Sequence, residues 1–243
     1  MEEAADMGNY LPISFKTRSE QEYIAFLWDT FEANYSHGNF QFAFLAYHML
    51  TMSFVYFNIW QIRQARLNDF EMGLIGFGKD IEKNLLEATS PFVFSSVNER
   101  SILRLLKLIG CDNGKISTYA KLVDDRNDTA HPNGNIFYST QAALDSKIAE
   151  ILRVVEEIEL HSRPVIEHTY REFLLQNHNS EEREYPDAND QIRELLIHKN
   201  YLSQKDINFC LSFDLTDLVD RPEIDNIRRL HEALKSIYGP DDE

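Results

Sequence analysis

The segment from Phe42 to Trp60 contains no charged residue, and Asp and Glu are absent from Ala33 to Asn68. Its length approaches the roughly 20 apolar residues that a membrane-spanning helix requires. Four polar side chains interrupt it: His48, Thr51, Ser53 and Asn58. A helix that is apolar on nearly every side also fits at the centre of a helical bundle or in a dimer interface. We therefore predict a helix that lies at the centre of the bundle or in a dimer interface, and no association with a membrane.

Helical periodicity extends over most of the remaining chain, whereas strand-like alternation is scarce. Only 9 Gly and 7 Pro punctuate the 243 residues, so long uninterrupted elements are expected, and a hydrophobic content of 43% suffices for a sizeable core. The pair Ser19 and Glu22 has the spacing of a capping box at a helix start. Further helices are expected over about 40–69, 116–130 and 141–176. The fold class predicted is an all-α, up-and-down bundle.

Three regions follow from the composition along the chain. Residues 1–18 are polar and interrupted by Pro12, and are expected to form a loose N-terminal arm. Residues 19–178 carry the helical bundle. The polar stretch 177–190, which contains Pro186, is the best candidate for a linker. Residues 187–239 then form a small helical extension.

The charge balance restricts the kinds of partner. With 40 acidic and 24 basic residues, the net charge is −16. A surface of this sign repels phosphate backbones at long range, which excludes a broad basic face that coats nucleic acid. Any contact with RNA is therefore expected at one confined site.

The cysteines and the N-terminus indicate a reduced compartment. Cys111 and Cys210 lie far apart, without a CxxC pattern or a His at ligand spacing, so neither a disulfide framework nor a metal site is indicated, and no cofactor is expected. The chain opens with acidic residues, where a signal peptide would carry positive charge before an apolar run. A cytoplasmic location is expected.

The segment 124–134, with the sequence DDRNDTAHPNG, departs from ordinary helix building. Asp, Asn and Thr compete for backbone hydrogen bonds and are unfavourable inside a helix, and such breaks of a local rule tend to mark functional sites. Arg126 and His131 are five positions apart, which separates them by ~140° on a continuous helix. Pro132 biases His131 away from the α conformation, so the helix should end there. The imidazole could then turn toward the face of Arg126.

This segment resembles the signature of the HEPN superfamily, in which Arg, a polar residue and a few further residues precede a His. Arg126, Asn127 and His131 occupy these positions, and the resemblance extends over about Glu20 to Gln176. It implies a helical bundle with metal-independent RNA cleavage, in which two copies of the motif meet across a homodimer. Arg126 would then neutralise phosphate charge, His131 would transfer protons, and Asn127 would orient the His or bind a phosphate oxygen.

The spacing alone discriminates poorly, because three other pairs have similar spacing. These are Arg163 with His168, Arg171 with His178, and Arg193 with His198. Their Arg residues are followed by Pro or Glu inside ordinary amphipathic patterns, so a solvated helix face is expected for them. Only Arg126 is followed by a polar Asn and, after the His, by Pro-Asn-Gly.

Some features depart from the family pattern. Certain HEPN toxins carry a Tyr two residues after the His, which a nucleotidyltransferase antitoxin modifies, but position 133 is Asn here. Tyr138 is expected to be a packing residue. Asp124, Asp125 and Asp128 place negative charge beside a phosphate site, which would weaken RNA binding or restrain the Arg.

Three functions remain open from the sequence. The first is a metal-independent endoribonuclease of a stress, phage-defence or toxin system, acting on tRNA or mRNA and controlled by an antitoxin or an activating partner. The second is a catalytically silent HEPN module that binds a nucleotide, RNA or a protein. The third is an unrelated helical interaction protein in which Arg126 and His131 merely cap a helix.

Overall fold

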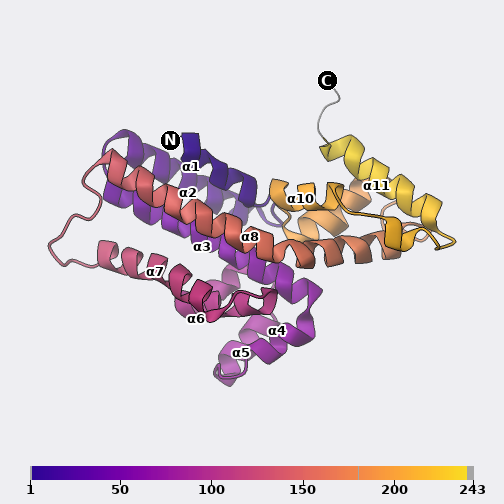
Figure 1. Cartoon of the computed structure of the whole chain (residues 1–243), viewed down its shortest axis with the longest axis horizontal. Coiled ribbons are helices and arrows are strands. Elements are labelled where there is room, and N and C mark those ends of the chain that lie inside the picture. The colour runs from indigo at the N-terminus through magenta and orange to yellow at the C-terminus, as the bar shows by residue number, and fades with distance from the viewer. Residues whose placement is uncertain (1, 180, 240–243) are drawn as a thin grey trace.

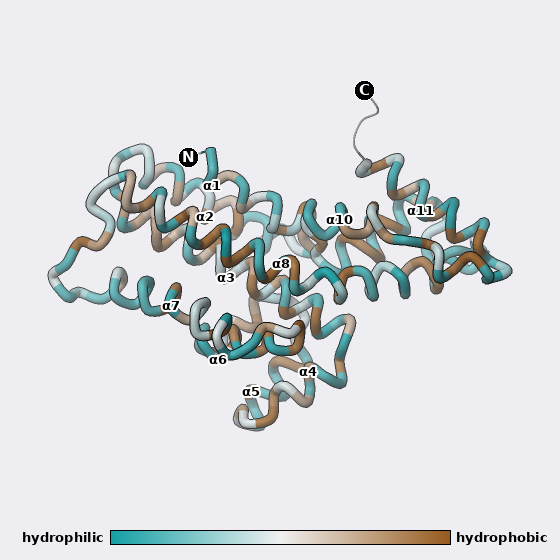
Figure 2. The backbone as a smooth tube through the Cα atoms, in the orientation of Figure 1, coloured by the Kyte–Doolittle hydropathy of each residue, from teal (hydrophilic) through white to brown (hydrophobic). Residues whose placement is uncertain are grey.

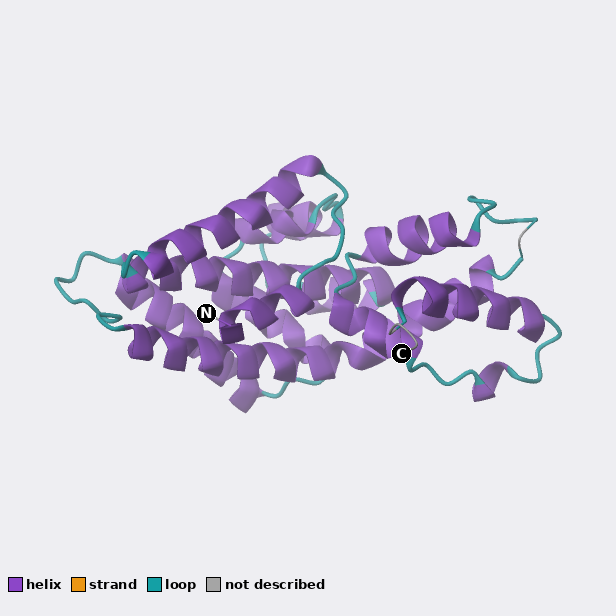
Figure 3. Cartoon of the chain, turned by 90° about the horizontal axis from the view of Figure 1, so that it is seen from above, coloured by secondary structure: helices purple, strands orange, loops and turns teal. Residues whose placement is uncertain are grey.

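The computed structural model describes residues 2–179 and 181–239, which form helices and no strand (Figure 3). The predicted all-α fold class is confirmed. The label η marks a 3-10 helix, except that η4 is a π-helix. In chain order, the elements are α1 (Glu2–Ala5), η1 (Asp6–Tyr10), α2 (Arg18–Ser36), α3 (Phe40–Ala65), α4 (Leu67–Gly73), α5 (Lys79–Leu86), η2 (Pro91–Ser96), α6 (Glu99–Leu103), η3 (Arg104–Ile109), α7 (Asn113–Ala130), α8 (Gln141–Asn177), α9 (Ala188–Gln191), η4 (Ile192–His198), α10 (Gln204–Leu211), η5 (Thr216–Leu218) and α11 (Ile224–Tyr238).

Helix α3 lies at the centre of the bundle. It packs against α2, α8, α7 and η2, and in Figure 1 α2 and α8 lie along it on the side away from α7. By length and composition α3 could cross a membrane, but 83% of its most apolar window is buried inside the protein. Of the two expected places for this helix, the structure therefore shows the centre of the bundle. Most residues of α3 are buried, and hydrophobic residues recur along it and along its neighbours (Figure 2).

Helix α2 begins slightly earlier than the sequence suggested. Its N-cap is Thr17, whose side chain accepts a hydrogen bond from the Glu20 backbone N–H, while the Glu20 carboxylate accepts one from Thr17. This reciprocal pair is a capping box, and it replaces the expected pair of Ser19 and Glu22. Two Ser/Thr-x-x-Glu patterns overlap here. The capping box is formed by the one whose Glu, Glu20, is buried.

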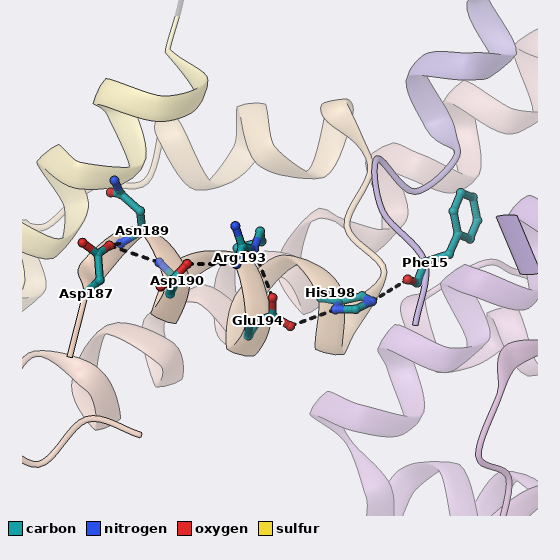
Figure 4. A network of polar contacts seen from close by, with 7 residues as sticks. All are labelled: Phe15, Asp187, Asn189, Asp190, Arg193, Glu194 and His198. Carbon is teal, nitrogen blue, oxygen red and sulfur yellow. Dashed lines mark hydrogen bonds and ion pairs between the residues drawn. The ribbon is translucent and has the colours of Figure 1, made fainter. Parts of the chain in front are cut away.

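The expected loose arm at residues 1–18 is wrong for the described part of that segment. Ala4, Met7 and Leu11 are buried in the main core, and the Ala4 carbonyl accepts a hydrogen bond from the Tyr47 hydroxyl at 3.2 Å. The Phe15 carbonyl lies within hydrogen-bond distance of Nε2 of His198 (Figure 4). The arm packs because its few apolar residues cover a gap beside α8.

A second hydrophobic core lies at the C-terminal end of the molecule (Figure 1). It contains residues of η4, α10, η5 and α11, together with the last third of α8: Ile166, Tyr170, Phe173 and Leu174. The two cores therefore divide inside α8, between Val165 and Ile166, and not at the polar stretch 177–190. Pro164 stands just before this division without ending the helix.

Buried polar contacts join the two cores. Gln61 of α3 donates to the Tyr201 carbonyl at 3.3 Å and to Asp206 Oδ2 at 3.0 Å. The carboxyl of Glu159 on α8 lies near that of Asp206, and both are buried. Burial raises the pKa of Glu159 well above its usual range, and the nearby Asp206 raises it further. A negative charge on one carboxyl makes ionisation of the other less favourable, which is why both effects act in the same direction.

Candidate functional site

Helix α7 ends where the sequence predicts. Its last residue is Ala130, and His131 follows in an extended conformation with φ −84° and ψ 143°. The His131 backbone N–H still donates to the Asn127 carbonyl at 3.0 Å. Pro132 lacks an N–H and disfavours the α conformation at His131, which explains the helix end.

Two of the three acidic side chains near the end of α7 have cationic partners. Asp124 pairs with Arg100 of α6, and Asp125 Oδ2 lies 2.8 Å from Nζ of Lys147 on α8. These two ion pairs offset the negative charge that the sequence placed beside Arg126. Part of the unusual polar content of this segment therefore has a structural role, because it ties α7 to its neighbours.

Arg126 belongs to a chain of polar contacts that crosses three helices. Its Nη2 lies 2.8 Å from Glu99 Oε1 at the start of α6, and Glu99 Oε2 lies 3.1 Å from Nε2 of His48 on α3. His48 is 1% exposed, and its Nδ1 has no partner within the described residues. A ring that donates from Nε2 leaves only a lone pair unsatisfied at Nδ1, so this tautomer fits the site.

The same contacts fix the charge of Glu99. Burial acts to raise its pKa, but the hydrogen bonds and charges of His48 and Arg126 outweigh burial, and the pKa of Glu99 lies below its usual range. Burial also raises the pKa of neighbouring Tyr56. The site therefore contains the Glu99 carboxylate, held between nitrogen atoms of His48 and Arg126. The same contact fixes one edge of the Arg126 guanidinium.

Beside this chain of contacts lies a pocket of about 970 Å³ between α2, α3, η2, α6 and α7. Arg126 and Asn127 line it, together with Glu99. The remaining wall is largely apolar, with Tyr23, Met49, Met52, Tyr56, Phe92, Val97 and Val123, and has a rim of Ser and Asn side chains. Two of the three predicted site residues, Arg126 and Asn127, thus line the same pocket.

His131 lies elsewhere. It is exposed, does not line the pocket, and its imidazole forms no hydrogen bond or ion pair with residues 2–179 or 181–239. The expectation that the imidazole turns to meet Arg126 is therefore not fulfilled within one chain, because Arg126 is held by Glu99 on α6. The structure brings Arg126 and Asn127 together and leaves His131 facing solvent.

The loop after His131 lies against the start of α3. Gln41 Oε1 accepts a hydrogen bond from the Phe137 N–H at 3.0 Å, and Gln41 Nε2 donates to the Thr129 carbonyl at 3.2 Å. Ile136 and Phe137 in this loop are 73% and 42% exposed. Tyr138 is instead buried against Phe44, with ring centroids 4.4 Å apart, and its predicted packing role is confirmed.

The pairs with similar spacing lie on helix surfaces. Arg163 pairs with Glu167 one turn along α8, and Arg171 pairs with Glu172. Arg193 pairs with Asp190 and Glu194, as expected for a solvated face (Figure 4). His198 differs, because it connects Glu194 to the N-terminal segment.

The sequence reasoning missed Glu99 and His48 as members of the site. His48 was visible as a polar residue in an apolar helix, and a buried imidazole requires a hydrogen-bond partner. Nothing in the local pattern around Glu99 singles it out. Within the described residues no group of three or more His, Cys, Asp or Glu has the arrangement of a metal site, and both cysteines are buried and unpaired.

No protein-family model matches the sequence, and no curated protein or solved structure is significantly similar to the chain. The interpretation of the site therefore depends on its residues and their geometry.

Proposed function

We propose that this protein is a metal-independent endoribonuclease of the HEPN type, with Arg126, Asn127 and His131 as its site residues. The observation that carries the proposal is the placement of Arg126 and Asn127 in a large pocket, one helical turn before an exposed His131. The resemblance of the segment 126–131 to the HEPN signature supplies the reaction class.

The proposed reaction is the attack of a ribose 2′-hydroxyl on the adjacent phosphate. A bond forms between the 2′-oxygen and phosphorus, and the bond from phosphorus to the 5′-oxygen breaks. One imidazole accepts the 2′-hydroxyl proton, and a second imidazole donates a proton to the departing 5′-oxygen. Arg126 stabilises the charge that develops on the phosphate oxygens. The products are a 2′,3′-cyclic phosphate and a 5′-hydroxyl.

We place this reaction at a homodimer interface, since His131 is exposed near Arg126 whereas the other imidazole of the site, that of His48, is buried and paired with Glu99. His131 of one protomer and the partner subunit's His131 would supply the two proton-transfer groups. Exposed Ile136 and Phe137 beside His131, and Phe42 at 62% exposure near Gln41, offer an apolar surface for a second copy. The proposal also includes a cytoplasmic role in defence, stress or toxin systems, with an antitoxin or activating partner.

Cleavage of a structured RNA such as tRNA in the presence of EDTA tests this function. We expect 2′,3′-cyclic phosphate ends with the wild type and their loss in both Arg126→Ala and His131→Ala. The matched controls are Arg163→Ala and His168→Ala, which have the same spacing on the surface of α8 and should retain cleavage. Persistent cleavage by His131→Ala would contradict the mechanism.

A second function is favoured by one observation, the ion pair between Arg126 and Glu99. A guanidinium already neutralised by a carboxylate fits a catalytically silent module that binds a nucleotide, RNA or protein. Binding of RNA without cleavage, in wild type and His131→Ala alike, would favour this alternative.

A further inference from the structure

We infer that the pocket beside Arg126 receives an unpaired nucleobase of the RNA, with the adjoining phosphate at Arg126. This inference rests on the proposed function and assigns its substrate class: single-stranded or looped RNA. Three features of the pocket carry it, namely an aromatic wall, free donors at one end, and a size that accepts a base together with its sugar.

The aromatic wall suits a flat ring. Tyr23 and Phe92 are both half-buried, and their ring centroids lie 5.2 Å apart at an interplanar angle of 85°. The edge of one ring therefore packs against the face of the other, and both rings line the pocket. Met49 and Met52 add flexible thioethers that adapt to rings of different shape. Stacking on such a wall tolerates any base, because every base has a π-face.

The polar end suits a phosphate and a base edge. Arg126 uses Nη2 for Glu99, and the other guanidinium nitrogens form no ion pair or hydrogen bond with the described residues. They are available to phosphate oxygens. The Asn127 amide also forms no hydrogen bond within residues 2–179 and 181–239, and it offers both a donor and an acceptor to a base edge.

The size and the charge of the protein select unpaired RNA. A volume of about 970 Å³ lies at the upper end of the range for ligand pockets, roughly 300–1,000 Å³. Bases inside a duplex are stacked and cannot enter a pocket unless they leave the helix. With a net charge of −16, the protein cannot rely on phosphate contacts alone, so contact with a base must supply part of the affinity.

Fluorescence anisotropy with a dye-labelled 2′-O-methyl tetranucleotide tests the inference at constant salt. This probe lacks a free 2′-hydroxyl, so binding is measured without the proposed cleavage. We expect at least about tenfold weaker binding when all four bases are removed from the same backbone, or when the probe is in a duplex. Equal binding of the base-bearing and abasic probes would overturn the inference.

Two pairs of variants locate the binding. Tyr23→Leu removes one ring of the wall and should weaken binding about tenfold, whereas Phe26→Leu, at an exposed position on the same helix, should not. Met49→Glu places a carboxylate at the pocket and should also weaken binding, whereas Met72→Glu makes the same charge change at an exposed site outside it. Equal effects within either pair would overturn the inference, provided that circular dichroism shows folded proteins.

The outcomes separate this inference from the proposed function. If binding at the pocket depends on the bases but ordinary RNA is not cleaved, the base-binding inference is supported and the proposed nuclease function is rejected. Cleavage that depends on Arg126 and His131, without any preference for base-bearing probes, would retain the nuclease and remove the base pocket.

Discussion

Arg126 is bound to Glu99 through one guanidinium nitrogen, with Nη2 and Oε1 2.8 Å apart. The side chain of Glu99 is 17% exposed and that of Arg126 is 34% exposed, so the pair lies at the boundary between pocket and core. Because His48 holds the second oxygen of Glu99 from inside the bundle, the fold itself sets the position of Arg126. Glu99 is thus a positioning residue in the proposed reaction.

Replacement of Glu99 tests this role. Glu99→Gln keeps the size of the side chain but removes the charge that holds Arg126, and we expect kcat for RNA cleavage to fall about tenfold to a hundredfold. The change in RNA affinity should be much smaller. Asp124→Asn is the matched control. It also neutralises a carboxylate near the pocket, but this carboxylate pairs with Arg100 and not with Arg126. A faster Glu99→Gln enzyme would mean that Glu99 restrains Arg126 and does not position it.

The buried carboxyl pair predicts an unusual dependence of stability on pH. The pKa of Glu159 is raised in the folded protein. The contribution of this residue to the free energy of unfolding is therefore fully present below its ordinary pKa of about 4.3 and is lost as the pH rises toward its pKa in the folded protein. Glu159→Gln mimics the protonated acid, and its stability relative to wild type should increase from pH 5 to pH 9. Urea midpoints measure this difference. Glu156→Gln, exposed on the same helix, should show no such trend.

The hydroxyl of Tyr201 contributes to the stability of the junction between the two cores. It lies 2.9 and 3.0 Å from the two oxygens of Glu20, which is buried. Tyr201→Phe removes one donor from this carboxylate and should lower the free energy of unfolding by about 1–3 kcal/mol. Thermal or urea unfolding measures the change, and Tyr238→Phe serves as a control in the second core. Equal stabilities of the two variants would contradict the prediction.

The apolar surface beside His131 predicts the oligomeric state. Ile136→Ser and Phe137→Ser together should shift the protein from dimer to monomer in light scattering at micromolar concentration. Leu160→Ser, at a position that is 60% exposed on α8, should leave the mass unchanged. A monomeric wild-type protein would contradict the proposed composite site, because no partner subunit would then supply the second imidazole.

The elements that the sequence predicts well are those set by local periodicity. The limits of α8 were expected at 141 and 176 and are observed at Gln141 and Asn177, and the end of α7 before His131 follows from Pro132. These features depend on the conformational preferences of neighbouring residues, which can be read along the chain.

The contacts that were missed join residues far apart in the chain. His48 and Glu99 are 51 positions apart, and Tyr201 and Glu20 are 181 apart. Their pairing depends on how the helices pack, which no short pattern encodes. The N-terminal arm was misjudged for the same reason, because its three buried apolar residues gain their burial only from distant helices.

Helix α8 runs through both cores without interruption, and this continuity bears on how the protein can be dissected. A chain that ends at residue 178 would lose the residues that pack against the end of α8. It would then expose a row of apolar side chains on that helix: Ile166, Tyr170, Phe173 and Leu174. Truncated versions of the bundle would aggregate, and a protease that nicks the polar stretch 177–190 would leave both fragments associated. We therefore expect the two cores, which share helix α8, to unfold together.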